Sequence, residues 1–313
     1  MEIMIWGVVF VVALGALIKG ADWVLESARK IGLSLGMSPF VVGVIIVGFG
    51  TSTPELASSI FGMLEGATEI PAANVIGSNI ANILLIIGFS AIVARGAFAV
   101  KKDLINLEIP LLALSTLFFY GTIYDGIITF AECLFLLAGF AIYTAYSILH
   151  RDEEDKEKAL AKPAGTSPKD VVLLILGFIL LIGGAKYLID AVLAISTAAG
   201  ISVGIITILA VAVGTSLPEL IVSAKAAMAK QADLALGNIY GSNIYNALFI
   251  IGVSGFFGTQ KLDEATLTLA VPMFLGTTFL FLISSISRRI YLWEGAFYLL
   301  IYALFVSKLF GWV

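Results

Sequence analysis

The sequence has few charged residues, one cysteine and one histidine, and these shortages exclude several classes of protein. Only 13% of the 313 residues are charged, whereas 60% are hydrophobic, and the mean hydropathy is +1.05. A soluble domain of this length needs far more polar surface. The single cysteine, Cys133, excludes a disulfide framework and a thiolate metal cluster. The single histidine, His150, lies in a polar stretch, so the His ligands of a metalloenzyme are missing as well.

Long apolar runs make up most of the sequence. They recur along the whole chain and are about 20 residues long, the length that an α-helix needs to cross the hydrocarbon core. The sequence therefore predicts an all-α membrane protein with ten transmembrane helices. The predicted spans are residues 3–27, 38–64, 71–94, 104–121, 127–149, 170–194, 202–228, 234–257, 265–285 and 291–310.

A duplication divides the chain into two halves. The segment GTSTPEL at Gly50–Leu56 returns 164 residues later as GTSLPEL at Gly214–Leu220, and a second segment, NxxGSNIxN, begins at Asn74 and again at Asn238. From position 50 to position 88, 17 of 39 residues are identical to their partners. We therefore expect two repeats of five helices each, joined by a polar linker. These parts are residues 1–149, 170–313 and 150–169.

Basic residues in the loops predict the orientation of the chain. They follow the odd-numbered spans of the first repeat, the seventh span and the ninth span: Arg29, Lys30, Arg95, Lys101, Lys102, Arg151, Lys156, Lys158, Lys162, Lys169, Lys230, Arg288 and Arg289. Such loops face the cytoplasm, which places both termini outside the cell and the 150–169 linker inside. Because each repeat has an odd number of spans, the second repeat is inverted in the membrane, as in many alternating-access carriers.

Each GTSxPE segment places a carboxylate directly after a helix break. Pro54 cannot donate a hydrogen bond to the carbonyl of Gly50, and Glu55 follows at once. Pro218 and Glu219 repeat the arrangement. A carboxylate inside a membrane segment is costly, so its default interpretation is functional. Hydroxyl groups accompany both carboxylates, on Thr51, Ser52, Thr215 and Ser216. Carbonyl, hydroxyl and carboxylate oxygens suit hard cations such as Ca²⁺ and Na⁺, and two carboxylates balance one Ca²⁺.

The second shared segment adds a polar stripe to a membrane helix in each half. Ser78 and Asn82 are four residues apart and share one helix face, as do Ser242 and Asn246. Asn74 and Asn238 continue the two stripes by one turn. Such stripes also join helices through hydrogen bonds. We favour a cation site because both stripes accompany a broken helix that bears a glutamate, at the same offset.

Other charges inside the predicted spans show weaker patterns. Asp22 and Lys186 occupy matching positions in the two halves and could pair with each other. Alternatively, each could extend to a membrane face, or Lys186 could pair with Asp190 one turn later. Glu108 and Glu132 have no repeat partner. We interpret both glutamates as residues near the interface or between paired helices.

At these two segments the sequence resembles the calcium/cation antiporter superfamily, and in particular the prokaryotic sodium/calcium exchangers. The resemblance rests on the doubled GTSxPE and NxxGSNIxN segments, which cover about a quarter of the chain, and it implies four cation positions at mid-membrane. Its implied ligands are Glu55 and Glu219 for Ca²⁺ and Na⁺, the carbonyls of Thr51 and Thr215, Ser52, Ser78, Ser216 and Ser242 at flanking Na⁺ positions, and Asn82 and Asn246 at the centre. Several members have Asp where this chain has Asn246, and the paired asparagines also resemble proton/calcium exchangers.

These observations predict a secondary antiporter of the cell membrane that exchanges Na⁺ for Ca²⁺ by alternating access. Exchange of Ca²⁺ for H⁺ at the same two glutamates is the alternative. A channel or an intramembrane enzyme fits less well, because channels do not require broken helices in inverted repeats and no nucleophile–base pair is visible. The expected partners are the two ions and the lipid bilayer, without a cofactor or nucleic acid, and a monomer suffices for transport.

Overall fold

Helices make up most of the structure. The computed structural model describes residues 2–37, 41–94, 98–99, 102–149, 167–198, 214–287 and 289–312.

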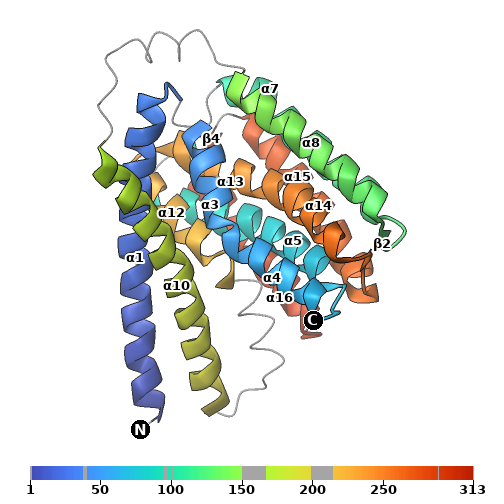
Figure 1. The fold of residues 1–313 in the computed structure, drawn as a ribbon, viewed down its shortest axis with the longest axis horizontal. Coiled ribbons are helices and arrows are strands. Elements are labelled where there is room, and N and C mark those ends of the chain that lie inside the picture. The colour runs from blue at the N-terminus through green and yellow to red at the C-terminus, as the bar shows by residue number, and fades with distance from the viewer. Residues whose placement is uncertain are drawn as a thin grey trace.

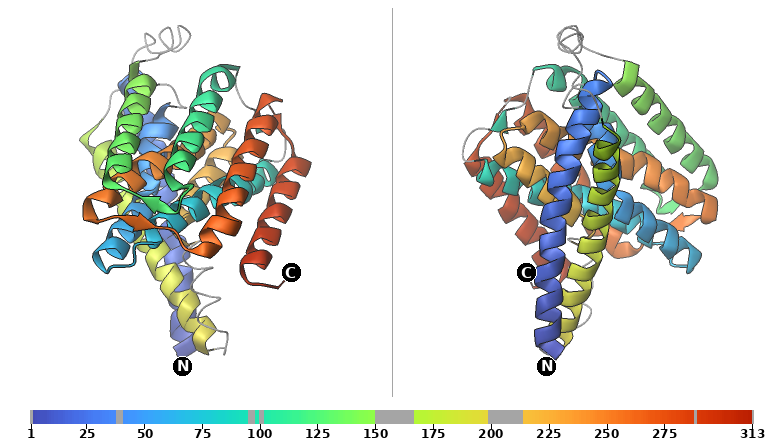
Figure 2. Two further views of the ribbon diagram at one scale, coloured as in Figure 1. Left: turned by 90° about the vertical axis from the view of Figure 1, so that its right-hand side faces the viewer. Right: turned by 60° about the vertical axis from the view of Figure 1, so that its left-hand side comes forward.

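The first helices of the two halves form an antiparallel pair. α1 (Glu2–Ser34) and α10 (Pro168–Ala198) lie side by side and extend beyond the other helices (Figure 1, Figure 2). A Cβ atom at Gly20 would lie 2.8 Å from the main-chain oxygen of Gly177, and one at Gly184 would lie 3.0 Å from that of Ala13. Small residues thus bring the two backbones into direct contact, which is the usual basis of helix association in lipid.

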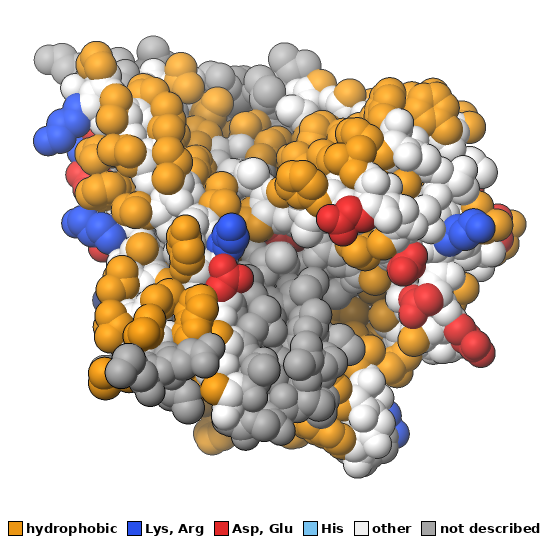
Figure 3. Space-filling view, turned by 60° about the horizontal axis from the view of Figure 1, so that its bottom comes forward, with side chains coloured by type: hydrophobic (Ala, Val, Ile, Leu, Met, Phe, Trp, Pro, Cys, Tyr) orange, Lys and Arg blue, Asp and Glu red, His pale blue; other side chains and the backbone are white. Residues whose placement is uncertain are grey.

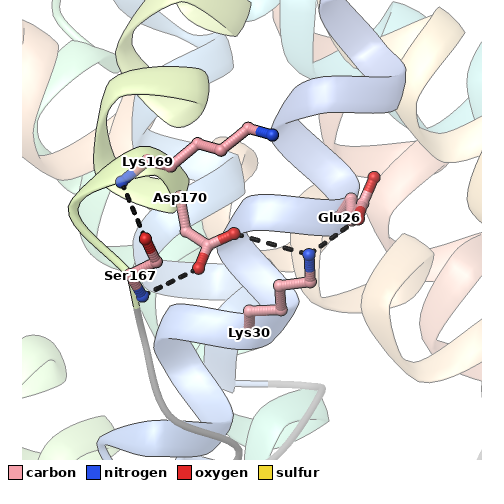
Figure 4. Close-up of polar contacts among 5 residues, drawn as sticks. All are labelled: Glu26, Lys30, Ser167, Lys169 and Asp170. Atoms are coloured by element: carbon pink, nitrogen blue, oxygen red, sulfur yellow. Dashed lines mark hydrogen bonds and ion pairs between the residues drawn. The ribbon is translucent and has the colours of Figure 1, made fainter.

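Ionic contacts join α1 to the start of α10 at the end of the polar linker (Figure 4). Lys30 Nζ lies 2.7 Å from Glu26 Oε1 and 3.4 Å from Asp170 Oδ1. Asp170 Oδ2 accepts a hydrogen bond of 2.9 Å from the main-chain N–H of Ser167. These pairs contribute little to stability, because the Lys30 side chain is exposed to solvent.

Another ion pair joins α1 to a helix of the second half. Asp22 pairs with Lys225, whose Nζ also donates to the carbonyl of Ile18 at 3.0 Å. Lys186 lies with its Nζ 5.8 Å from the ring centre of Tyr187. Asp22 therefore has Lys225 as its partner in place of Lys186.

The inner helices of each half carry the repeated segments. In the first half they are η1 (Val42–Gly48), α3 (Phe49–Thr51), α4 (Thr53–Leu64), α5 (Ile70–Ala81), η2 (Asn82–Ile87) and α6 (Gly88–Val93). In the second half they are α12 (Leu217–Met228), α13 (Ala232–Ile244), η3 (Tyr245–Ile250) and α14 (Ile251–Ser254). The π-helical segments η2 and η3 begin at nearly the same point of the two motifs. Such turns are rare and often occur at functional sites.

Longer helices surround this centre (Figure 1). They are α7 (Lys102–Ile123), α8 (Phe130–Leu149), α15 (Val271–Ile286) with the preceding η5 (Thr266–Ala270), and α16 (Leu292–Leu309), and the short η4 (Gly255–Phe257) follows α14. The segment Ile70–Val93 is 78% buried, whereas Phe130–Ser147 and Leu292–Leu309 are each 22% buried. The helix that bears the Asn–Ser–Asn stripe is therefore central, and the last helix of each half is peripheral.

Four short strands link the two halves. β1 (Phe98–Ala99) pairs antiparallel with β4 (Arg289–Ile290), and β2 (Ile127–Ile128) pairs antiparallel with β3 (Gln260–Lys261). β1 and β3 occupy related positions in the two halves, as do β2 and β4, to within two residues. Because α7 separates β1 from β2 and α15 separates β3 from β4, the two small sheets lie at opposite ends of these helices. This is the pattern that an inverted pair of repeats produces.

Five helices in the described ranges are long and apolar enough to cross a membrane, namely Met4–Ser34, Ile70–Val93, Phe130–Ser147, Thr266–Ile286 and Leu292–Leu309. The bent pair Val42–Thr51 and Thr53–Leu64 makes a sixth span, and the apolar part of α7 is shorter. Residues 199–213, which include the start of the predicted span 202–228, lie outside the described residues. The protein is thus a helical membrane protein with five or six apolar spans in its described part.

Apolar side chains cover the outside of the peripheral helices. Met4, Val8 and Val12 of α1 are 61–71% exposed, and Phe297 and Leu300 of α16 are 65% and 63% exposed. One face of the molecule shows broad hydrophobic areas, with acidic and basic side chains gathered at several points between and beside them (Figure 3). An exposed surface of this kind is stable only against lipid.

Candidate cation site

The chain bends where the first GTSxPE segment predicts a break. The axes of Val42–Thr51 and Thr53–Leu64 differ by 41°, with the bend at Ser52. Ser52 has φ −83° and ψ 12°, and its partner Ser216 has φ −85° and ψ 6°, so both copies adopt the same local backbone. A new helix starts directly after each serine and carries its glutamate in the first turn. The positive end of the helix dipole favours a carboxylate at that place.

The carbonyl that Pro54 leaves free is satisfied within the protein in the first copy. The hydroxyl of Thr53 donates to the oxygen of Gly50 at 2.8 Å. The second copy has Leu217 at the equivalent position, which has no hydroxyl group. This carbonyl therefore has different surroundings in the two halves.

Each glutamate contacts hydroxyl groups from the other half of the chain. Ser52 donates to Glu219 Oε1 at 2.8 Å, and Ser216 donates to Glu55 Oε1 at 3.4 Å. Ser78 adds a second donor to Glu55 Oε1 at 3.4 Å. The two carboxylates are 1% and 0% exposed. The repeated segments thus meet at one buried centre to which both copies contribute.

Close backbone contact holds the first broken helix against α13. A Cβ at Gly43 would lie 2.5 Å from the carbonyl oxygen of Leu234, and one at Gly241 would lie 2.6 Å from that of Val44. Ser242, the fourth serine of the predicted set, donates to the carbonyl of Gly48 at 3.2 Å. Its contact is therefore with the main chain of the first half.

The repeated asparagines Asn74 and Asn238 act as helix connectors. Asn74 Nδ2 donates to the carbonyl of Glu55 at 3.1 Å and to Ser58 and Ser59 at 3.0 and 3.1 Å. Asn238 Nδ2 donates to Ser223 at 2.8 Å, and Asn238 Oδ1 accepts a hydrogen bond from the hydroxyl of Thr51 at 3.2 Å. The first residue of each polar stripe therefore joins helices, as the helix-packing interpretation of the stripe predicts.

A layer of four amides lies where the two stripes meet. Asn82 Nδ2 donates to Asn243 Oδ1 at 2.9 Å, and Asn246 Nδ2 donates to Asn79 Oδ1 at 3.0 Å. Asn79 Nδ2 donates to the main-chain carbonyl of Asn243 at 3.0 Å. Our sequence reasoning did not select Asn79 or Asn243. Their presence in both copies of NxxGSNIxN, on a second face of the same helix, was the available signal.

Four buried oxygen atoms of this centre have no hydrogen-bond partner among the described residues: Glu55 Oε2, Glu219 Oε2, Asn82 Oδ1 and Asn246 Oδ1. Buried oxygens normally have partners. A set of carboxylate and amide oxygens with free lone pairs can coordinate a hard cation. No group of three or more His, Cys, Asp or Glu side chains occurs in the ranges that the structure covers.

All ten predicted ligands are buried in the structure, namely Thr51, Ser52, Glu55, Ser78, Asn82, Thr215, Ser216, Glu219, Ser242 and Asn246. The two other glutamates have different surroundings. Glu108 is buried beside Tyr143 of α8, whose hydroxyl lies 3.5 Å from its Oε2, so it joins two helices. Glu132 is half-buried at the start of α8 and accepts hydrogen bonds from the N–H and hydroxyl of Thr129.

A buried all-oxygen centre between two related halves of a helical membrane protein is typical of cation carriers. Comparison with known proteins identifies the family. Residues 5–149 and 169–311 match the family described as sodium/calcium exchanger protein. The chain belongs to this family, and it is a transporter rather than an enzyme.

Relatives and solved structures agree over nearly the full length. The sodium/calcium exchanger MaX1 of Methanosarcina acetivorans is 33% identical over 98% of this chain and 97% of that protein. The inner membrane protein YrbG of Escherichia coli is 29% identical over 81% of this chain and 80% of its own. The structure of the sodium–calcium exchanger NCX_Mj soaked with Na⁺ and Ca²⁺ has a TM-score of 0.82 at 29% identity, covering 97% of this chain and 98% of that one.

Proposed function

We propose that this protein exchanges Na⁺ for Ca²⁺ across the cell membrane by alternating access and that it extrudes Ca²⁺ from the cell. The observation that carries the proposal is the set of four unpartnered oxygens on Glu55, Glu219, Asn82 and Asn246. These atoms come from both halves, and all four are buried. Family membership supports the same activity, since MaX1 and NCX_Mj are both described as sodium/calcium exchangers.

The proposal includes an architecture of ten transmembrane helices in two inverted repeats, residues 1–149 and 170–313. The antiparallel pair of α1 and α10 and the reciprocal pairing of the four strands support it. The distribution of basic residues supports external termini and a cytoplasmic linker at residues 150–169. Glu55 and Glu219 are the shared ligands of Ca²⁺ and Na⁺ in this proposal. Thr51 and Thr215 supply main-chain carbonyls, and Ser52, Ser78, Ser216 and Ser242 complete the flanking Na⁺ positions.

Uptake of radioactive Ca²⁺ into proteoliposomes loaded with Na⁺ tests the proposal. We expect uptake that requires internal Na⁺, and we expect Glu55→Gln and Glu219→Gln each to abolish it, because each removes a charge that neutralises Ca²⁺. Glu264→Gln is the matched control, since Glu264 is exposed at the start of the ninth predicted span. Near-normal transport by either of the two site variants would reject this site.

Charge balance predicts an effect of membrane voltage on this uptake. One Ca²⁺ neutralises two carboxylates, whereas three Na⁺ leave one positive charge, so each cycle moves one net charge. In Na⁺-loaded vesicles that charge moves outward as Ca²⁺ enters. An inside-positive potential should therefore speed uptake, with about 2.3 kcal/mol per cycle available at 100 mV. A rate that does not change with an imposed potassium diffusion potential would indicate a neutral cycle.

Exchange of Ca²⁺ for H⁺ is the second candidate. Asn82 and Asn246 are both amides, so the centre has two carboxylates, and two protons would neutralise them as one Ca²⁺ does. The same vesicles distinguish the two functions. Uptake driven by an outward proton gradient in the absence of Na⁺ would favour H⁺ as the counter-ion.

A further inference from the structure

One hydrogen bond in the amide layer fixes the orientation of the Asn79 side-chain amide and, through it, that of Asn246. Asn79 Nδ2 donates to the main-chain carbonyl of Asn243 at 3.0 Å. A carbonyl oxygen can only accept, so the NH₂ group of Asn79 must face Asn243. The other end of the same amide, Oδ1, consequently faces Asn246.

The orientation of Asn246 follows from that of Asn79. Because Asn79 presents an oxygen, Asn246 must present its NH₂ group to it, and the Nδ2 to Oδ1 distance is 3.0 Å. The carbonyl oxygen of Asn246 is then directed away from Asn79. That oxygen is buried and has no hydrogen-bond partner among the described residues.

The related half of the layer lacks this anchor. Asn82 Nδ2 donates to Asn243 Oδ1 at 2.9 Å, but Asn243 Nδ2 is buried without a partner in the described part of the chain. In the described part of the chain, no main-chain contact therefore determines whether the oxygen or the NH₂ group of Asn243 faces Asn82. The main-chain carbonyl of Asn243 fixes the orientation of Asn79 and thereby that of Asn246. Asn82 instead donates to the side-chain oxygen of Asn243.

We propose that Asn79 is a positioning residue that keeps the carbonyl oxygen of Asn246, rather than its NH₂ group, directed at the bound cation. This inference rests on the proposed function. Without Asn79 the Asn246 amide can rotate by half a turn, and its NH₂ group would then repel the cation. Residues that orient metal ligands in this way typically change affinity by about 10- to 100-fold when they are replaced.

The test is calorimetric Ca²⁺ binding to the purified full-length protein. We expect Asn79→Ala to weaken Ca²⁺ binding by about 10-fold or more. Asn79→Leu, which keeps the branched heavy-atom skeleton but has no hydrogen-bonding group, should have the same effect. Thermal melting and size-exclusion profiles of both variants identify any that fail to fold.

A second substitution separates positioning from packing. Asn246→Asp presents an oxygen in either orientation, so in this background Asn79→Ala should weaken binding by less than about 3-fold, whereas two independent effects would simply add. Asn74→Ala is the matched control, because Asn74 lies on the same helix and joins α4 to α5. Any effect that it has should be equal in both backgrounds.

Two results would overturn the proposal: wild-type affinity in Asn79→Ala, or an equal loss with and without Asn246→Asp. Binding without Na⁺-dependent or H⁺-dependent uptake would contradict the proposed function while leaving this inference intact. An absence of Ca²⁺ binding by the wild-type protein would remove both.

Discussion

Gly66 and Lys230 are equivalent residues of the two halves, and both have a left-handed backbone. Their φ angles are 82° and 58°, and Lys230 is the one residue other than glycine with positive φ in the described chain. Each ends its helix with the same pair of hydrogen bonds, from Ala67 to Gly62 and from Gly66 to Met63 in the first copy. In the second copy the bonds run from Gln231 to Ala226 and from Lys230 to Ala227. The turn geometry is therefore common to both halves, although only glycine adopts it without steric cost.

Replacement of Lys230 by glycine should stabilise the protein. A left-handed conformation costs a residue with a side chain about 1–2 kcal/mol relative to glycine. Some of this gain is lost, because glycine is more flexible in the unfolded chain. We expect a higher melting temperature in detergent for Lys230→Gly. Lys230→Ala, which removes the charged chain but keeps the Cβ atom, should show no gain, and an equal gain in both variants would assign the effect to loss of the lysine side chain rather than to the backbone.

At the scale of elements, the contact between α1 and α10 depends on glycine at particular positions. Gly20 faces the backbone of α10, whereas no described atom lies within 4 Å of a Cβ built at Gly15 on the same helix. The ion pair of Asp22 with Lys225 adds a link from α1 to α12, the helix that bears Glu219. The first helix thus contacts both its repeat partner and an element of the candidate site.

Gly20→Ala should loosen the α1–α10 pair. Its Cβ would lie 2.8 Å from the Gly177 oxygen and 3.0 Å from Leu180 Cβ, so the helices must separate, and overpacking of this kind costs about 1–3 kcal/mol. Gly15→Ala places the same methyl group in open space on the same helix. Thermal denaturation in detergent should show a lower melting temperature for Gly20→Ala only. Equal melting temperatures for the two variants would show that the helices are not in close contact at Gly20.

For the whole molecule, two related halves make reciprocal contacts. Strands of each half pair with strands of the other at both ends of α7 and α15, and the serine of each GTSxPE segment contacts the glutamate of the other. A site assembled in this way changes whenever one half moves relative to the other. This is the arrangement that alternating access requires.

Inverted repeats predict that equivalent turns face opposite sides of the membrane. Glu65 and Ala229 are related by 164 residues, and both are exposed. In intact cells a membrane-impermeant maleimide should label Glu65→Cys, and it should label Ala229→Cys only after lysis. The native Cys133 is buried and provides the unlabelled background. Labelling of both variants from the same side would contradict the inverted arrangement.

The linear sequence is enough to predict the membrane class, the duplication and the candidate ligands. Apolar runs and a repeat of 164 residues are properties of the linear chain, and Pro54 and Pro218 mark the helix breaks without any knowledge of packing. These features follow from local chemistry, since lipid enforces helices and proline removes a donor. The resemblance of the two repeated segments to the antiporter superfamily was visible there as well, and comparison confirms the family.

The contacts between distant residues are seen only in the folded protein. The fold joins Ser52 to Glu219 and Asp22 to Lys225, and it makes Asn79 a neighbour of Asn246. All of these contacts cross between the two halves of the chain. They depend on the angle and depth at which the helices cross, and side-chain types and spacing along one helix do not specify these quantities. Helical periodicity shows which residues share a face, but the partner of that face is determined by packing.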